Sequence, residues 1–320
     1  MKAAVYDQTG APDVLRYEDV PDPTVRPNSV LIRVEAISIE GGDTLNRLGG
    51  AMTSSPHIVG YQCAGTVIEV GDSVTDRAIG DRVVATMASG SHAELVAVPA
   101  SATWSVPEGL DITHAACVPI AFGTADDCLF EFGRLKAGET VLVQAGAGGV
   151  GIAAIQLAKR AEATVLATAS SDDRLDRLAQ FGLDHGINYR TDDFAKVARS
   201  LTDGRGVDLV VDSVGSTLAG SMRSLAYRGR ISYVGNAGRD QHPVDVAALM
   251  GGNQSIQGVF LGAELAPGTR AHDNITRLID EVARGELQVV VDRTYPLAEA
   301  AAAHAYLEDR HAFGRVVLVP

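Results

Sequence analysis

A glycine-rich turn between a strand-like and a helix-like segment constrains this chain more than any other stretch. Residues 140–145 form a short apolar run rich in β-branched side chains, as a buried strand does. The run continues into GAGGVG, in which Gly146, Gly148 and Gly151 have the GxGxxG spacing, and a helical pattern of apolar residues follows. Strand, glycine turn and helix in this order predict a dinucleotide-binding site.

Each glycine has its own expected role. We expect Gly146 to permit a tight turn, Gly148 to let the backbone approach a pyrophosphate, and Gly151 to let helix and strand pack closely. The helix that opens with Gly149 and Val150 would then point its first N–H groups at the phosphates, and its dipole would add to the attraction. A turn that needs glycine for geometry alone is the alternative, and the strand–helix context favours the cofactor site.

The composition is that of a folded α/β protein with two domains. The chain has 320 residues, of which 46% are hydrophobic and 34 are glycine. It has no run of 18 apolar residues and no signal-like start, so we expect no membrane span. Cys63, Cys117 and Cys128 form no CxxC pair, and reduced thiols in a cytoplasmic protein are expected. The net charge of −13 argues against nucleic-acid binding, which depends on neutralising phosphates.

The pattern of expected elements changes twice along the chain. Before about residue 121, short strands at 29–36, 65–70, 81–86 and 92–98 are separated by glycine turns, which indicates a compact barrel-like domain. Strands then alternate with helices, which predicts a doubly wound parallel sheet with helices on both faces. These strands are 140–145, 164–169, 186–189, 207–214, 229–235 and 255–260, and the helices are 149–160, 172–181, 193–201, 218–226 and 244–250. The last part of the chain should form a helix at 274–284, a strand at 288–292, a helix at 297–307 and a strand at 314–319.

A series of motifs in one order resembles the medium-chain dehydrogenase/reductase superfamily, and within it the zinc-free quinone oxidoreductase branch that includes zeta-crystallin. The motifs are MKAAVYDQTGAPDVLRYEDVPDP, GDRVV, LKAGETVLVQAGAGGVGIAAIQLAK, GINYR, GRGVDLVVDSVG and FGRVVL. The resemblance implies a Rossmann NADP-binding domain (122–262) inserted in a GroES-like β-barrel catalytic domain (1–121 and 263–320). It also implies a cleft between the domains for nicotinamide and substrate, and a homodimer through the edge strand 255–260. An ordinary capped edge is the alternative for that strand.

The places of the zinc ligands in zinc-dependent relatives hold other residues here. Glu40 takes the place of the first cysteine, Tyr61 and Gln62 that of a His-Glu pair, and Ile120 that of a later cysteine. Catalytic zinc needs thiolate or imidazole ligands, and Glu40 with His57 would make a poor site, so we expect no metal. Without a Lewis acid, the expected reaction is hydride delivery to an acceptor that is already polarised, such as a quinone or an α,β-unsaturated carbonyl.

The residues after the second expected strand of the sheet favour NADPH over NADH. An NAD site would place an Asp or Glu there, about 20 residues after the glycines, whereas this chain has Ser170 and then Arg174. Small hydroxyls and a guanidinium suit a 2′-phosphate, and the resemblance adds Tyr189 to that site. An ion pair with Asp173 or Asp176 on the helix surface is the alternative for Arg174.

The resemblance also places further residues along the cofactor. These are Thr124, Val150, Ser213 or Val214, Gly235, Asn236, Phe260, Leu261, Gly262 and Arg315. Interdomain packing is an equal alternative for Phe260.

Three residues are candidates for catalysis. Burial would raise the pKa of Glu40 and make it a proton donor, whereas a solvated loop glutamate is the favoured alternative. Asp43 is interpreted first as an acceptor for backbone N–H groups, and Tyr61 as a packing residue. The sequence thus predicts an NADPH-dependent, zinc-independent oxidoreductase acting on a quinone or activated alkene. An enoyl or alkenal reductase and a non-catalytic NADPH-binding protein are the alternatives.

Overall fold

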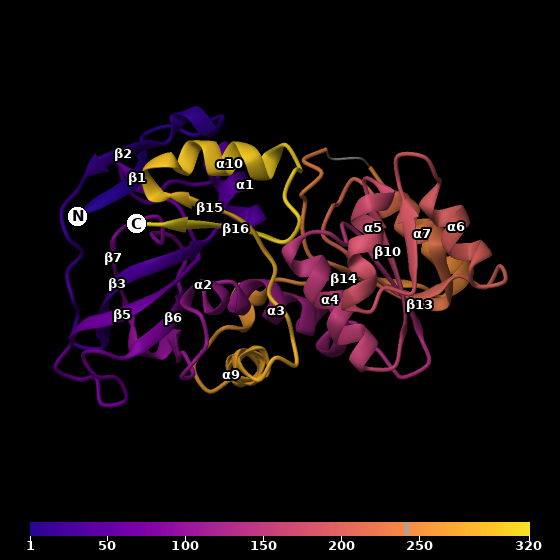
Figure 1. Ribbon diagram of the computed structural model, residues 1–320. Coiled ribbons are helices and arrows are strands. Elements are labelled where there is room, and N and C mark those ends of the chain that lie inside the picture. Colours follow the sequence, from indigo (N-terminus) through magenta and orange to yellow (C-terminus); the bar gives the residue numbers. More distant parts are fainter. Residues whose placement is uncertain (241–242) are drawn as a thin grey trace. The chain divides into compact units, whose positions relative to one another are not determined.

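The chain forms two compact units in a computed structural model that describes residues 1–240 and 243–320. Unit 1 combines Met1–Ile120 with Glu264–Pro320, and unit 2 is Ala121–Ala263. Both the indigo and the yellow end of the chain therefore belong to unit 1 (Figure 1). Among the residues that the structure describes, no helix is long and apolar enough to cross a membrane.

Unit 2 is built on a six-stranded sheet in which every strand pair is parallel. Its strands are β9 (Thr140–Val143), β10 (Thr164–Ala169), β11 (His185–Asn188), β12 (Val207–Asp212), β13 (Leu225–Tyr233) and β14 (Ser255–Gly258). Their order across the sheet is β11-β10-β9-β12-β13-β14. The strands after β9 are first added on one side of it, as β10 and β11, and then on the other side, as β12, β13 and β14. This is the doubly wound Rossmann arrangement, and the predicted fold of this part is confirmed.

Helices flank this sheet. They are α3 (Val118–Asp126), α4 (Gly149–Arg160), α5 (Asp172–Leu178), α6 (Phe194–Ser200), α7 (Leu218–Ser224) and α8 (Leu261–Glu264), with short turns η3 (Asp127–Glu131) and η4 (Ala179–Phe181). Helix α4 packs against β9 and β10, and α7 against β12 and β13 (Figure 1). The helix expected at 244–250 is instead a 3-10 helix, η5 (Val246–Gly252), because Gly251, Gly252 and the left-handed Asn253 do not favour a longer α-helix.

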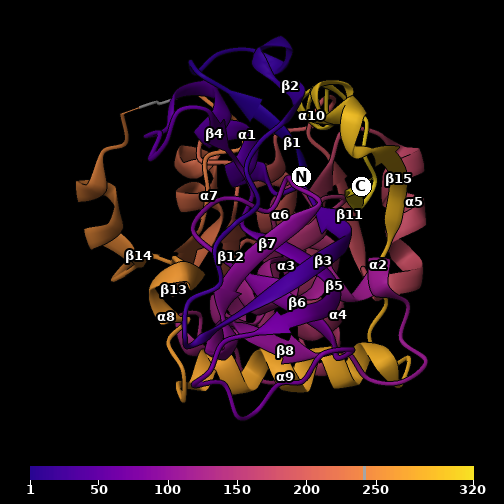
Figure 2. The same cartoon turned by 90° about the vertical axis from the view of Figure 1, so that its left-hand side faces the viewer.

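Unit 1 contains a seven-stranded sheet and a three-stranded sheet. The larger has the order β15-β16-β3-β5-β6-β8, with β7 also paired to β3, and the smaller has the order β2-β1-β4. Their bounds are β1 (Lys2–Tyr6), β2 (Arg16–Asp19), β3 (Ser29–Ser38), β4 (His57–Ile58), β5 (Gln62–Val70), β6 (Arg82–Thr86), β7 (Leu95–Pro99), β8 (Thr103–Ser105), β15 (Val291–Pro296) and β16 (Arg315–Val319). Figure 2 shows β3, β5, β6 and β7 lying together, with α9 running along β8.

The helices of unit 1 are short except for one near its end. They are α1 (Gly41–Gly49), α2 (Ile112–Ala115), α9 (Arg270–Ala283) and α10 (Ala300–Glu308), with 3-10 turns η1 (Pro12–Val14), η2 (Ala100–Ala102) and η6 (Leu297–Glu299). Helix α9 begins four residues before the expected 274, because the Thr269 hydroxyl accepts a hydrogen bond from the His272 N–H and caps it.

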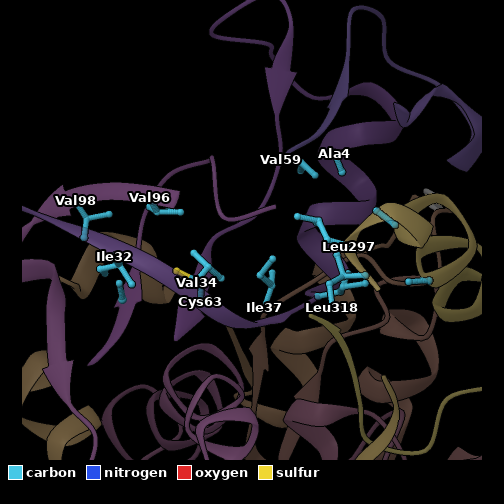
Figure 3. Packing of buried hydrophobic residues seen from close by; sticks show 14 of the residues in the cluster. Ala4, Ile32, Val34, Ile37, Val59, Cys63, Val96, Val98, Leu297 and Leu318 are labelled. Atoms are coloured by element: carbon cyan, nitrogen blue, oxygen red, sulfur yellow. The ribbon is translucent and has the colours of Figure 1, made fainter. Parts of the chain in front are cut away.

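The core of unit 1 requires both ends of the chain. Ile32 and Ile37 of β3 and Cys63 of β5 are buried with Leu318 of β16 in one apolar cluster (Figure 3). Strand β16 pairs antiparallel with β3, and Leu318 lies opposite Ile37. The last strand therefore completes a sheet that the first forty residues begin, so that unit 2 is an insertion in the sequence of unit 1.

Candidate functional site

The glycine turn of unit 2 is a compact loop between β9 and α4. The Gly146 N–H donates to the Thr168 carbonyl (2.8 Å), and the Gly148 N–H donates to the Ala145 carbonyl (2.9 Å). The left-handed backbone is at Ala145, with φ of +52°, and not at Gly146. A Cβ on Gly146 would lie 2.8 Å from the Ala167 Cβ. Gly146 is thus a central residue of the tight turn that the Gly148–Ala145 hydrogen bond closes, and it also packs closely on β10, whereas Ala145 has the left-handed conformation.

The other two glycines differ in what surrounds them. A Cβ on Gly151 would lie 2.4 Å from the Ala145 carbonyl oxygen, so this position needs glycine for α4 to approach the turn. A Cβ on Gly148 would meet nothing closer than that same oxygen at 3.4 Å. The first turn of α4 has no intrahelical acceptors for its N–H groups, and the space in front of Gly148 suits a phosphate, which fits the pyrophosphate of a dinucleotide.

The residues expected at a 2′-phosphate come together at the ends of two neighbouring strands. Ser170 directly follows β10, and the Tyr189 N–H donates to the Ala169 carbonyl (3.1 Å), which places Tyr189 beside the end of β10. The Ser171 hydroxyl caps α5 by accepting from the Arg174 N–H (3.4 Å). Arg174 thus lies on the first turn of the helix that follows Ser170, as the sequence predicted.

The loops after β12 and β13 hold the next group of expected cofactor residues. The Ala237 N–H donates to the Ser213 carbonyl (3.1 Å), and a Cβ on Gly235 would lie 2.9 Å from that same oxygen. Ser213, Gly235 and Asn236 therefore line two loops that lie against each other. Both loops follow the carboxyl ends of their strands, where ligands bind in doubly wound folds.

The remaining expected cofactor residues of unit 2 have very different exposure. Phe260, just beyond β14, is 74% exposed, whereas the next residue, Leu261, is buried. A Cβ on Gly262 would lie 2.7 Å from the Phe260 ring, so the glycine lets this ring fold back over α8. Thr124 is buried within α3.

A second cluster of functional residues lies in unit 1, around Arg315 of β16. The guanidinium donates to the Ser38 hydroxyl (2.7 Å), to the Ile39 carbonyl (2.6 Å) and to the carboxylate of Glu40. Gln62 donates its amide N–H to the same Glu40 oxygen and accepts from the Ile120 N–H (3.1 Å). Glu40 is only 4% exposed. The interpretation of Glu40 as a solvated loop residue is therefore wrong, because β16 brings a cation to it.

Burial dominates the electrostatics of this cluster. It raises the pKa of Glu40 to about 7, although the Arg315 guanidinium and the Gln62 amide oppose the rise. Burial also raises the pKa of Asp43, whose carboxylate accepts from the Glu40 backbone N–H (2.8 Å) at the start of α1. Two ionisable carboxyl groups thus lie in a nearly dry site beside one buried cation.

Tyr61 lies at the edge of this cluster and is partly exposed. Its hydroxyl oxygen accepts from the Asn46 side-chain amide (3.1 Å), which leaves the O–H proton available to another acceptor. A Cβ on Gly42 would lie 2.3 Å from that hydroxyl, so glycine is needed for the ring to pack on α1. Burial raises the pKa of Tyr61 above its ordinary value, and the phenol stays protonated.

Comparison with known proteins finds a family match in each unit. Residues 26–108 match the family described as "Alcohol dehydrogenase GroES-like domain", and residues 149–284 match "Zinc-binding dehydrogenase". The chain is 34% identical to a 2-haloacrylate reductase from a Burkholderia species, over 99% of this chain and 98% of the relative. This chain belongs to the quinone oxidoreductase branch of the medium-chain dehydrogenase/reductases. It is an oxidoreductase, as the motif series predicted.

Solved members of this branch share the whole fold. Escherichia coli quinone oxidoreductase, whose structure was solved in complex with NADPH, has a TM-score of 0.94 and 28% identity, with 100% of both chains covered. A mycobacterial protein, also solved in complex with NADPH, has a TM-score of 0.94 and 35% identity over 100% of both chains. The fold predicted from the motifs, a Rossmann domain inserted in a GroES-like domain, is thereby confirmed.

The residues of this oxidoreductase do not suit the zinc that the description of its second family suggests. The places of the zinc ligands hold Glu40, the pair Tyr61 and Gln62, and Ile120, and Arg315 donates to the one carboxylate among them. In residues 1–240 and 243–320, no three His, Cys, Asp or Glu side chains lie close enough to hold a metal ion. A guanidinium and an amide are not zinc ligands, and we derive no step through zinc.

Sequence reasoning missed the links between these residues. It treated Glu40 as a candidate acid and Arg315 as a cofactor contact. In the structure, Arg315 of β16 forms an ion pair with Glu40, which follows the end of β3. Gln62 was considered only as a lost zinc ligand, yet it connects Glu40 to the Ile120 backbone. The only available signal was the resemblance, which places the last strand beside the N-terminal ones.

Proposed function

We propose that this protein is an NADPH-dependent reductase that transfers hydride to a quinone or another activated acceptor. The observation that carries the proposal is the phosphate-binding geometry of unit 2. Its glycine turn is open at Gly148, and Ser170 and Arg174 follow β10 where an NAD site would carry an acid. Relatives that match along the whole chain were solved with NADPH, which supports the same cofactor here. Unit 2 is the proposed NADP-binding domain and unit 1 the catalytic domain.

The cofactor would be held by the ends of the six strands of unit 2. The turn at Gly146–Gly151 and the first N–H groups of α4 would bind its pyrophosphate. Ser170, Arg174 and Tyr189 would bind the 2′-phosphate, because hydroxyls and a guanidinium complement that dianion. The loops carrying Ser213 and Asn236 and the segment after β14 would contact the remainder. When bound, the nicotinamide supplies the hydride.

Unit 1 would supply the groups that respond to charge on the acceptor. The Tyr61 hydroxyl would donate a hydrogen bond to the oxygen that becomes enolate-like, which is an oxyanion-hole role. Glu40 would exchange the proton, since its pKa of about 7 suits general acid catalysis at neutral pH. Asp43 would hold the start of α1 through the Glu40 N–H. Arg315 would position Glu40, in addition to its expected contact with the cofactor.

One experiment tests the class of reaction. NADPH binding is first measured by fluorescence titration, and NADPH oxidation is then followed over a panel of quinones, enones and enoyl thioesters. We expect binding in the micromolar range, at least tenfold tighter than that of NADH, and turnover with at least one class of acceptor. Tight binding without oxidation of any acceptor would instead identify a non-catalytic NADPH-binding protein.

A reductase of activated carbon–carbon double bonds is the second candidate. It is favoured by the similarity to 2-haloacrylate reductase along nearly the full length of both chains. Such a reductase needs a proton donor for the α carbon as well as an oxyanion donor, and Glu40 and Tyr61 offer one of each. Turnover of enones or haloacrylates with little activity on quinones would select this candidate over the first.

A further inference from the structure

Four buried polar side chains of unit 2 form a hydrogen-bonded chain beneath the glycine turn. The Thr168 hydroxyl donates to the Gln144 side-chain oxygen (2.8 Å), the Gln144 amide donates to the Ser221 hydroxyl (3.2 Å), and Ser221 donates to the Asp212 carboxylate (2.7 Å). All four residues are at most 1% exposed. Three of them, Gln144, Thr168 and Asp212, stand at or just beyond the carboxyl ends of β9, β10 and β12.

The first end of this chain of hydrogen bonds holds the strained residue of the turn. The Ala145 N–H donates to the Thr168 hydroxyl oxygen (3.2 Å), and the Gly146 N–H donates to the Thr168 carbonyl (2.8 Å). Ala145 has φ of +52°, a conformation that a residue with a Cβ adopts at a cost and keeps only where its surroundings hold it. Thr168 therefore holds the two N–H groups on which the shape of the turn depends.

The other end holds the loop that follows β12. One Asp212 oxygen accepts from the Val214 and Gly215 N–H groups (both 3.0 Å), and the Thr217 hydroxyl also donates to this carboxylate (2.9 Å). That loop carries Ser213, one of the expected cofactor residues. The hydrogen bonds thus connect three strand ends that surround the proposed nucleotide site, and each of the four side chains has at least one partner within the chain, which favours a rigid buried network.

We propose that Thr168 is a positioning residue for the nucleotide: through Ala145, Gln144, Ser221 and Asp212 it sets the glycine turn and the β12 loop in the arrangement that receives the pyrophosphate. Thr168 does not itself contact the cofactor in this proposal. It acts by preorganising backbone N–H groups, which lowers the cost of ordering them when the phosphates bind. The inference rests on the proposed function, because it takes a dinucleotide as the ligand.

The central test removes one hydroxyl at constant shape. Thr168→Val should weaken NADPH binding by about tenfold or more, because the Ala145 N–H and the Gln144 oxygen lose their partner in a buried site. Binding of adenosine 2′-phosphate, which has no pyrophosphate, should change by less than about twofold. Thr168→Ser keeps the hydroxyl and should restore most of the NADPH affinity. Thr164→Val makes the same change at the exposed first residue of β10 and is the matched control.

Two further measurements distinguish a positioning role of Thr168 from a general loss of ligand binding. Amide hydrogen exchange of the 145–150 segment in the free protein should be faster in Thr168→Val than in wild type, whether or not NADPH binds. Ser221→Ala interrupts the chain two steps further from the turn than Thr168 and should give a smaller loss of NADPH affinity. Equal NADPH affinity of Thr168→Val and wild type, or an equal loss for both ligands, would overturn the positioning role. Failure of the wild-type protein to bind NADPH would instead overturn the proposed function. In that case, equal amide hydrogen exchange of residues 145–150 in Thr168→Val and wild type would overturn the role of Thr168 in holding the turn.

Discussion

At the scale of single residues, the three glycines of the turn are not interchangeable. The sequence motif predicts a different role for each of them, and the structure shows that their surroundings differ. Gly146 is packed against β10, Gly151 is packed against the Ala145 carbonyl, and a Cβ on Gly148 would meet nothing closer than that oxygen at 3.4 Å. A methyl group added at each position would therefore affect folding in two cases and ligand binding in the third.

We predict opposite outcomes for Gly148→Ala and Gly151→Ala. Gly148→Ala should leave the melting temperature unchanged or slightly raised, because its methyl group is accommodated and the unfolded chain loses entropy. Its NADPH affinity should fall by about tenfold, since the methyl group enters the space of the pyrophosphate. Gly151→Ala should lower the stability by about 2 kcal/mol or more, because its Cβ would lie 2.4 Å from a carbonyl oxygen. Thermal unfolding and NADPH titration of both variants check this, and a normal affinity of Gly148→Ala would contradict it.

Glu40 carries the prediction about pH. Its carboxyl group has a pKa of about 7, so it is protonated below that pH and ionised above it. If Glu40 is the proton donor, the wild-type kcat should fall as pH rises through about 7. Glu40→Gln should lower kcat by about a hundredfold at pH 6 and should remove that fall. Steady-state rates between pH 5.5 and 9 measure both effects.

The matched control for this variant lies on β3, the strand that precedes Glu40. Glu35→Gln changes a partly exposed glutamate whose carboxylate accepts from the Thr66 hydroxyl (2.6 Å), and it should keep the wild-type pH profile. A Glu40→Gln enzyme with wild-type kcat and the same fall above pH 7 would show that Glu40 is structural. Melting temperatures at pH 7 confirm that each variant is folded.

At the scale of elements, helix α10 is held to the loop before β7 by two histidines. The Nε2 atoms of His92 and His304 are 3.0 Å apart, and both rings are buried. Burial lowers the pKa of His92 to about 3, and burial, His92 and the nearby Arg47 guanidinium all lower the pKa of His304. Both rings are therefore neutral in the folded protein, and one donates a hydrogen bond to the other.

This pair predicts a loss of stability in acid. Below about pH 6.5 the unfolded chain takes up protons at these histidines and the folded chain does not. The free energy of unfolding is therefore unaffected by the two histidines above that pH and decreases as the pH falls below it. His92 would cost up to about 1.4 kcal/mol per pH unit as the pH falls from 6.5 toward 3, and His304 adds a loss of stability in the same direction. His304→Leu should make the free energy of unfolding depend less steeply on pH below 6.5, because one of the two titrating histidines is removed. Denaturant unfolding at pH 7.5, 6 and 5 measures the slope, and parallel wild-type and variant curves would contradict the prediction.

Most elements of unit 2 were predictable because local signals and long-range packing agree there. Strand β10 and helix α4 have the predicted bounds, and α5 begins where Ser171 caps it. Parallel strands are buried on both faces and give clear apolar runs. Strand β15 was less predictable: it was expected at 288–292 and lies at Val291–Pro296, because its register follows its pairing with β16, and half-exposed residues give no clear pattern.

The candidate site was predictable only in part, for the same reason. Glycine spacing and the residue types after β10 are local features, so Gly148, Ser170 and Arg174 could be proposed as cofactor residues from the sequence. The pair of Glu40 and Arg315 joins residues 275 positions apart, and the Thr168 to Asp212 chain joins three strand ends. No spacing in the sequence reports such contacts, which arise from strand order.

At the scale of the whole molecule, the free edge of the unit 2 sheet carries the prediction of a dimer. Strand β14 pairs only with β13 among the strands that the structure describes. The Val259 N–H donates to the Tyr233 carbonyl of β13 (2.9 Å), so by alternation the backbone of Gly258 faces away from that strand. Tyr227 and Met250, near this edge, are 68% and 75% exposed. An unpaired edge with exposed apolar neighbours favours pairing with a second copy.

We therefore predict that the protein is a dimer through β14 and that Gly258→Lys separates it. A Cβ on Gly258 meets nothing within 4 Å, so the protomer should tolerate the lysine, whereas a charged side chain on an edge strand opposes pairing. Light scattering at micromolar concentration should give twice the chain mass of 33.4 kDa for wild type and a single chain mass for the variant. Gly49→Lys, at an equally open and exposed position in α1 of unit 1, should stay dimeric. A monomeric wild-type protein would contradict the prediction of a dimer. A dimer that survives Gly258→Lys would show that the dimer contact is not at β14, because pairing of this edge requires an uncharged strand on both copies.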